Sequence, residues 1–231
     1  MSTLILDDVT VSRGAGPVIR DVSLRVEPGS ITALVGPNGA GKTSLLESVS
    51  GVIAASSGTI SIDDEPIGSL SRVARARRGI VHIEQGRAVF GSLTVTENIR
   101  LTAGSQQKVD EAFEVFPELA KRAGSPAGLL SGGEQQMVVL ARAFASDPAF
   151  LLIDEMSLGL APVVFKRLLP LVSNFSEAGV GVLIVEQFTN LALEIASRAL
   201  VVSGGRVTYQ GTASELASSP AVLHTAYLGG A

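Results

Sequence analysis

Eight consecutive residues, Gly36-Pro37-Asn38-Gly39-Ala40-Gly41-Lys42-Thr43, fit the pattern G-x-x-x-x-G-K-[ST], and Ser44 follows them. Glycines in such a loop let backbone N–H groups face a phosphate without a Cβ in the way, and the start of the next helix adds partial positive charge. Lys42 is then placed for the β- and γ-phosphates of ATP, and the Thr43 hydroxyl for Mg²⁺. The alternative is a glycine turn that only caps a helix. The strand pattern before the loop and the helix pattern after it disfavour that alternative.

A second segment, Phe150-Leu151-Leu152-Ile153-Asp154-Glu155, places two adjacent carboxylates at the end of an apolar run. Ligand sites of parallel sheets lie at the carboxyl ends of strands. Because successive side chains of a strand point in opposite directions, we expect Asp154 to face Mg²⁺ or its waters. Glu155 is then expected to face an attacking water as a general base. Taken alone, the segment also fits a strand that ends in two solvated acids.

A third segment, Leu130-Ser131-Gly132-Gly133-Glu134, opens a predicted helix. Ser131 and Glu134 have the S-x-x-E spacing of a capping box, which gives these two residues a purely structural explanation. That explanation does not cover Gly132 and Gly133. Glycines in the first turn lower helix stability but leave the N–H groups open to close approach by an anion.

The elements expected around these motifs are those of an α/β protein. Residues 4–35 alternate short apolar runs with turn signals, such as residues 14–17, and predict small antiparallel strands. A buried strand at 31–35 and a helix at 43–50 flank the glycine-rich loop, and residues 56–69 are rich in turns. Further strands are predicted at 80–83, 149–154, 180–185 and 198–203, and helices at 70–78, 161–178 and 188–196. Residues 94–145 are predicted to be mostly helical, with breaks at Pro117 and around 124–128.

The composition narrows the class of protein. The 231 residues are 46% hydrophobic and can bury a sizeable core, and the net charge of −4 gives no reason to expect a nucleic-acid partner. Zero cysteines exclude disulfides and thiolate sites. We find no secretory signal and no apolar run of membrane-spanning length, so a cytoplasmic location is expected. The arginines are expected to form a solvated helix face, with contact to lipid or a membrane subunit as the alternative, and both histidines to be structural. They are Arg72, Arg75, Arg77 and Arg78, and His82 and His224.

The order of the three motifs resembles that of the ABC ATPase family, whose signature is an LSGGQ-like segment. Here Glu134 stands where that signature has Gln. The resemblance covers essentially the whole chain and implies a P-loop NTPase core with a mostly parallel sheet, an N-terminal antiparallel β subdomain and an inserted helical subdomain. It implies a single ABC ATP-binding domain over 1–231, with 1–86 and 146–231 as the nucleotide-binding core and about 87–145 as the helical signature subdomain.

The resemblance also implies roles for single residues. In this family two cassettes face each other head to tail, so Ser131, Gly132 and Gly133 would bind the γ-phosphate of a partner's ATP. Gln85 resembles the glutamine that senses Mg²⁺ and the attacking water, and its alternative is an exposed loop glutamine. Residues 157–160 occupy the place of the loop that touches the opposite subunit.

Three residues depart from the family pattern. Gln187 stands where the family usually has a histidine that contacts the γ-phosphate, and an amide can donate a hydrogen bond but cannot become cationic. Arg13 takes the place of an aromatic residue that stacks on adenine in many relatives, and a guanidinium can also stack on a base. Met156 replaces a proline, with consequences expected only for local packing.

Several segments are similar to the ATPase subunits of branched-chain amino-acid uptake transporters. They are residues 157–162, the pair Glu186-Gln187, residues 191–194 and residues 226–229. The segment at 84–87 differs from the subfamily, which commonly has Glu at the position of Gln85. The resemblance implies an ATP hydrolase with permease subunits, a second ATPase subunit and an extracytoplasmic solute-binding protein, on the inner face of the membrane. The alternatives are a transporter of a different solute and a non-transport ABC ATPase.

Overall fold

The computed structural model describes residues 2–14, 16–86 and 88–227. Its N-terminal sheet is antiparallel and contains, in spatial order, β2 (Gly16–Val26), β1 (Leu4–Arg13), β4 (Ser57–Ile62) and β5 (Glu65–Pro66). Alternate side chains of β1 and β2 are buried, as expected for a sheet with one covered face. The antiparallel prediction is confirmed, but β1 and β2 are long strands rather than small ones. Residues 15, 87 and 228–231 lie outside the described residues, and with them part of the predicted turn at 14–17 and of the segments at 84–87 and 226–229.

The second sheet has the order β10-β9-β3-β8-β7-β6 and is parallel except for β10 at one edge. Its strands are β3 (Ile31–Val35), β6 (Ile80–Ile83), β7 (Phe150–Asp154), β8 (Gly181–Val185), β9 (Arg198–Ser203) and β10 (Arg206–Thr212). Every residue of β3, β7 and β8 is buried, because layers cover both faces of the sheet. The predictions for β3, β6 and β9 are confirmed to the residue. Those for β7 and β8 begin one residue early.

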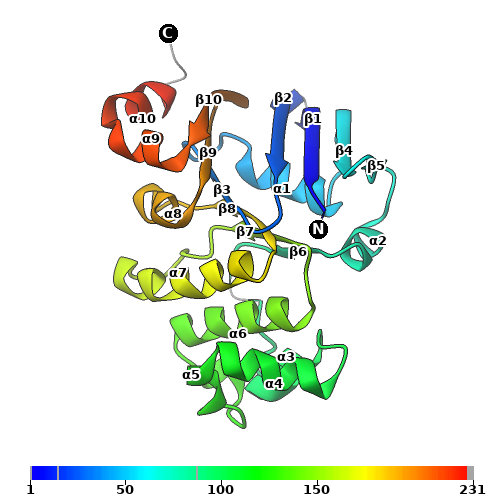
Figure 1. Cartoon of the computed structure of the whole chain (residues 1–231), viewed down its shortest axis with the longest axis vertical. Coiled ribbons are helices and arrows are strands. Elements are labelled where there is room, and N and C mark those ends of the chain that lie inside the picture. The colour runs from blue at the N-terminus through cyan, green and yellow to red at the C-terminus, as the bar shows by residue number, and fades with distance from the viewer. Residues whose placement is uncertain (1, 15, 87, 228–231) are drawn as a thin grey trace.

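Helices cover the six-stranded sheet (Figure 1). They are α1 (Lys42–Ser50), α2 (Arg72–Arg77), α7 (Pro162–Glu177), α8 (Thr189–Ile195), α9 (Ala213–Ser218) and α10 (Pro220–Tyr227). One apolar cluster fills the space between the two sheets and around α1, and the other covers the opposite face of the six-stranded sheet. Within the described part of the chain, no helix is both long and apolar enough to cross a bilayer.

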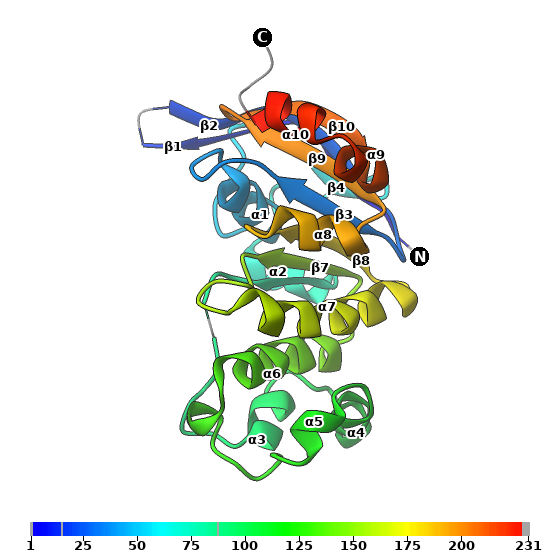
Figure 2. The same cartoon turned by 90° about the vertical axis from the view of Figure 1, so that its left-hand side faces the viewer.

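A helical part lies at the end of the molecule away from the N-terminal sheet, and α7 runs between it and the six-stranded sheet (Figures 1 and 2). It contains α3 (Val95–Arg100), α4 (Gln106–Val115), α5 (Pro117–Ala120), a 3-10 turn at Ala127–Leu129, and α6 (Gly132–Ala145). The predicted helices and both predicted breaks are confirmed, and a further break at 101–105 was not predicted. Phe144 joins this part to α7, because its ring makes edge contacts with Phe116 at 6.2 Å and with Phe175 at 5.8 Å between ring centroids.

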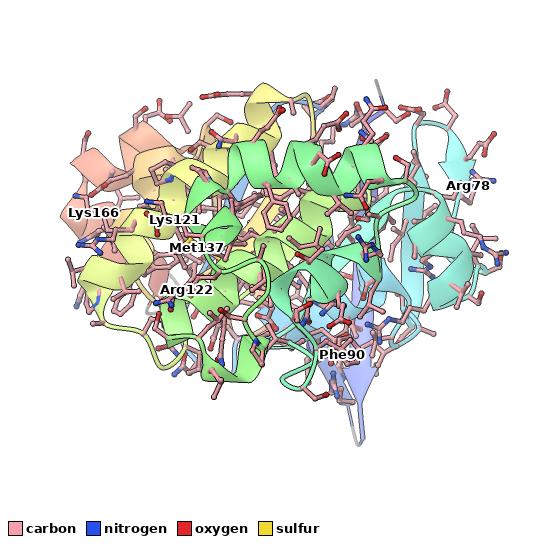
Figure 3. All side chains as sticks on the ribbon, turned by 90° about the horizontal axis from the view of Figure 1, so that it is seen from below. Arg78, Phe90, Lys121, Arg122, Met137 and Lys166 are labelled. Carbon is pink, nitrogen blue, oxygen red and sulfur yellow. The ribbon has the colours of Figure 1, made fainter. Side chains whose placement is uncertain are left out.

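Two side chains of the helical part, Asn98 and Arg142, hold the connection from β6 in place. Asn98 is fully buried and hydrogen-bonds the backbone of Phe90 in both directions, at 2.9 and 3.0 Å. The Arg142 guanidinium lies over the Phe90 ring, 5.1 Å from its centroid, and donates to the Ala88 carbonyl at 2.6 Å. Seen from below, Phe90 lies on the helical end of the molecule, well away from Lys166 (Figure 3). Ala88 and Phe90 are therefore fastened to the helical part.

The arginine-rich helix α2 corrects one expectation. Arg72, Arg77 and Arg78 are exposed, but Arg75 is only 2% exposed. Its guanidinium donates to four backbone carbonyls, at Ser48 (2.6 Å), Val49 (2.9 Å), Gly68 (2.8 Å) and Leu70 (3.1 Å). A solvated face was the wrong interpretation for this residue, because the end of α1 leaves carbonyls that a buried cation satisfies.

Candidate nucleotide site

The glycine-rich loop runs from the end of β3 to the start of α1, as its sequence predicts. Gly36 and Gly41 have positive φ angles, 148° and 98°. A Cβ on Gly36 would lie 2.0 Å from the Val202 carbonyl oxygen, and one on Gly41 would lie 2.4 Å from the Val18 carbonyl oxygen. Only glycine fits these two positions, because both the φ angle and the neighbouring backbone exclude a side chain.

The start of α1 is free to bind an anion. Its N-cap is Gly41, so no side chain caps the first N–H groups of the helix. Lys42 is 6% exposed, and its Nζ donates to the carbonyls of Gly36 (2.8 Å) and Pro37 (2.9 Å). Burial lowers the pKa of Lys42, against the opposing effect of the nearby carboxylates of Glu155 and Asp154. The loop's own carbonyls therefore bind the Lys42 ammonium. When ATP binds, a phosphate would take the place of these carbonyls as the partner of Lys42.

Asp154 and Glu155 follow one another at the carboxyl end of β7. Asp154 is 1% exposed, and burial raises its pKa, while hydrogen bonding from Thr43 works in the opposite direction. Its Oδ1 is buried and has no hydrogen-bond partner. Glu155 has a φ of 47°, a left-handed conformation that is strained for a residue with a Cβ.

Two glutamines, from the strands on either side of β7, complete the site. Gln85 follows β6, and its Nε2 donates to the Thr43 hydroxyl at 3.2 Å. Gln187 follows β8, and its Nε2 donates to the Glu155 carboxylate at 3.1 Å. Strands β3, β6, β7 and β8 are parallel, so residues separated by up to 150 positions meet at one edge of the sheet.

A pocket of about 350 Å³ lies at this edge. Its lining combines the loop and the start of α1 with Gln85, Glu155, Gln187 and Val18. Val18 comes from β2 and was not predicted, because no motif distinguishes it from other apolar strand residues.

The oxygen atoms beside Lys42 suit a hard cation. The unpartnered Oδ1 of Asp154, the Thr43 hydroxyl and the Gln85 side chain are neighbours. Across the described residues, no group of three or more His, Cys, Asp and Glu side chains could hold a metal ion. The carboxylate, hydroxyl and amide oxygens named above fit Mg²⁺, which proteins bind through one or two carboxylates and which takes other ligands from water and phosphate.

Arg13 lies beside this pocket but does not line it. Its Nε donates to the Ser44 hydroxyl at 3.0 Å, and its guanidinium forms an ion pair with Glu47 of α1. The arginine therefore braces β1 against α1. A role in stacking on adenine stays a prediction.

The signature segment lies outside the pocket. Ser131 is the N-cap of α6, and it forms the predicted capping box with Glu134: the Ser131 N–H donates to Glu134 at 2.8 Å, and the Glu134 N–H donates to the Ser131 hydroxyl at 3.4 Å. Gly133 is buried, and a Cβ there would lie 2.7 Å from the Val164 side chain on α7. Neither Ser131 nor Gly132 nor Gly133 touches the pocket of its own chain.

The fold and the loop define the class: this is a P-loop nucleotide-binding protein with an inserted helical part. A family model described as ABC transporter matches residues 19–157, which is more than half of the chain. The chain belongs to the ABC transporter family, as one of its ATP-hydrolysing subunits. Such subunits work with transmembrane permease partners.

Relatives and solved structures agree with this assignment. The chain is 39% identical to the high-affinity branched-chain amino acid transport ATP-binding protein BraG of Pseudomonas aeruginosa, over 98% of this chain and 100% of that protein. It is 35% identical to the lipopolysaccharide export system ATP-binding protein LptB of Escherichia coli, over 99% and 98%. Among solved structures, the ADP conformation of an ATP-binding cassette of an ABC transporter matches with a TM-score of 0.87 at 24% identity, over 99% of each chain.

Proposed function

We propose that this chain binds and hydrolyses Mg²⁺-ATP to power the uptake of branched-chain or other small amino acids. One observation supports ATP hydrolysis: the phosphate loop, Gln85, Glu155 and Gln187 line the same pocket. The similarity to BraG, and the 37% identity to the probable branched-chain amino acid transport ATP-binding protein LivF of Archaeoglobus fulgidus over 86% of this chain and 87% of that protein, support the solute class.

The hydrolysis step follows from these positions. Backbone N–H groups of the loop and Lys42 bind the phosphates, and Thr43, Asp154 and Gln85 would hold Mg²⁺, which when bound would neutralise phosphate charge. Glu155 accepts a proton from water as the water oxygen bonds to the γ-phosphorus, and the bond to the bridging oxygen of ADP breaks. Gln187 orients the Glu155 carboxylate by its hydrogen bond. Because an amide stays neutral, this contact adds no positive charge to the transition state.

Coupling to transport requires a second cassette. In the proposed dimer, Ser131, Gly132 and Gly133 bind the γ-phosphate held by the other subunit, and residues 157–160 touch that subunit. ATP binding then favours the closed dimer, and hydrolysis removes this preference. Residues 1–86 and 146–231 act as the core, and about 87–145 as the helical subdomain that transmits closure to the permeases. The chain would sit on the inner face of the membrane, with an extracytoplasmic binding protein delivering the solute.

The ATPase roles are tested by two substitutions. Glu155→Gln should keep ATP affinity within about twofold and lower turnover by at least about 100-fold, because the general base is lost. Lys42→Ala should abolish measurable nucleotide binding. Equilibrium binding of a fluorescent ATP analogue and phosphate release measure the two effects. Normal turnover of Glu155→Gln would remove Glu155 from its role, and normal binding by Lys42→Ala would refute the phosphate-loop assignment.

The solute is tested in cells. A strain that lacks this chain should lose uptake of radiolabelled leucine, and the wild-type chain but not Glu155→Gln should restore it. The second candidate is lipopolysaccharide transport, which the similarity to LptB favours over nearly equal lengths. Normal leucine uptake together with lipopolysaccharide retained in the inner membrane would replace the first candidate by the second.

A further inference from the structure

Glu186 is a buried carboxylate that none of these roles uses. It follows β8 directly and is only 1% exposed. Its Oε1 accepts the backbone N–H of Ser157 at 3.2 Å, and its Oε2 accepts the hydroxyl of Ser157, which is 3% exposed. A side chain from the end of one strand thus binds the loop that follows another.

This link lies beside the residues of the hydrolysis step. Gln187, the next residue, donates to Glu155 at 3.1 Å, and the Glu155 N–H donates to the Val185 carbonyl at 2.9 Å. Residues 155–157 and 185–187 are therefore joined at three successive points. Glu155 has the strained φ of 47°, and a strained residue keeps its conformation only where its surroundings over-determine it.

The same segment is held from a third direction. The Gln136 side chain of α6 is fully buried, and its Nε2 donates to the Met156 carbonyl at 2.9 Å. Directly after Ser157, the Leu158 side chain is 44% exposed at the surface. Ser157 is thus the point where the buried site meets the exposed loop.

We propose that Glu186 is a positioning residue for ATP hydrolysis: by binding Ser157, it keeps the exposed loop at Leu158 and the Glu155–Gln187 pair in one arrangement. This inference rests on the roles proposed above for Glu155 and Gln187. A displacement of the loop by the second cassette would then reach Glu155 through Ser157 and Glu186.

Packing alone is a weak reason to keep a carboxylate at this position. Burial raises the pKa of Glu186 to about 7, against the effect of the hydrogen bonds from Ser157, and the neighbouring Glu155 carboxylate raises it further. Replacing a buried ionic group together with its partner by well-packed apolar residues is often neutral or stabilising. If stability were its only role, the hydrogen-bonded pair of Glu186 and Ser157 could be replaced by apolar packing.

The test separates activity from stability. Glu186→Leu should lower the kcat of ATP turnover by about tenfold and leave the KM for ATP within about twofold, while the melting temperature falls because the buried Ser157 N–H and hydroxyl lose their acceptor. Glu186→Gln should keep turnover within about threefold of wild type, because its amide can accept from the Ser157 N–H and donate to the hydroxyl. Ser157→Ala should lower kcat less than Glu186→Leu, and the double variant should be no slower than Glu186→Leu alone.

The matched control is Ser176→Ala, which removes another serine hydroxyl bond, to the Ser173 carbonyl at 2.8 Å in α7. It should leave kcat unchanged. Wild-type turnover in folded Glu186→Leu, a loss confined to KM, or additive effects in the double variant would each overturn the proposal. If Glu186→Leu does not fold, unchanged kcat in Ser157→Ala overturns it. Full turnover of Glu155→Gln would instead refute the role of Glu155 itself.

Discussion

At the scale of single residues, Glu155 has a strained backbone conformation and is also the proposed general base. Its φ of 47° favours glycine, because a Cβ is crowded in the left-handed region. Glu155→Gly should therefore raise the free energy of unfolding by about 1 kcal/mol while abolishing ATP turnover. Chemical denaturation and phosphate release measure the two effects. Glu155→Ala is the control: it loses the carboxylate but keeps the Cβ, so it should gain no stability. A stability gain of equal size in both variants would contradict the strain argument.

The pKa of Glu186 gives the stability a defined pH dependence. Burial raises this pKa from 4.5 to about 7, so between these values the folded chain holds a proton that the unfolded chain has lost. Stability should fall as the pH rises through this window, by about 1.4 kcal/mol per pH unit and at most about 3.5 kcal/mol in total.

Glu186→Gln removes this titration. Its free energy of unfolding, relative to wild type, should increase by about 2 to 3 kcal/mol between pH 5 and pH 7.5. Urea unfolding at the two pH values measures the difference. The buried Asp154 also titrates, but both proteins contain it, so its contribution to the pH dependence cancels. Parallel pH profiles for the two proteins would show that Glu186 ionises normally.

At the scale of elements, Arg75 fastens α2 to the end of α1. Arg75→Ala leaves four backbone carbonyls without their donor and should lower the free energy of unfolding by about 3 kcal/mol. Arg77→Ala on the exposed side of the same helix is the matched control and should change it by less than about 0.5 kcal/mol. Thermal and urea unfolding compare the two. Equal effects would assign the loss to helix propensity rather than to the buried guanidinium.

The strands that position the site could be predicted because their signal is local. In β3, β7 and β8 every residue is buried, and this appears in the sequence as short apolar runs bounded by turns. By contrast, β10 lies at the edge of the sheet, is mostly half-exposed, and was missed. The long pairing of β1 with β2 was also underestimated, because pairing depends on contacts that no single window of sequence contains.

The residues of the site also divide into those that a local sequence motif predicts and those that only the fold brings together. The phosphate loop and the Asp154-Glu155 pair are contiguous and were found from residue types and spacing. Val18 and the link between Ser157 and Glu186 arise only when separate strands come together. Arg75 was misread for a related reason: the sequence of α2 shows an arginine every two or three residues, but not which one turns toward α1.

At the scale of the whole molecule, the signature segment lies outside the nucleotide pocket of its own chain. We expect Glu155→Gln with ATP to form a stable dimer, because each phosphate loop then holds an uncleaved γ-phosphate for the partner's Ser131, Gly132 and Gly133. Sedimentation velocity with and without ATP measures this. Lys42→Ala/Glu155→Gln is the control and should stay monomeric. A monomer at saturating ATP, in the variant that binds but does not hydrolyse it, would contradict the shared site.

The position of β3 between β8 and β9 also bears on how the protein is made. The strand that carries the phosphate loop leaves the ribosome early, but both neighbours follow only after another 145 residues or more. At translation rates of about 5–20 residues per second, β3 waits on the order of ten seconds for its first partner. Throughout that interval both edges of β3 lack their hydrogen-bonded neighbours in the nascent chain, and unpaired strand edges promote aggregation, so a chaperone should protect the segment that leads into the phosphate loop.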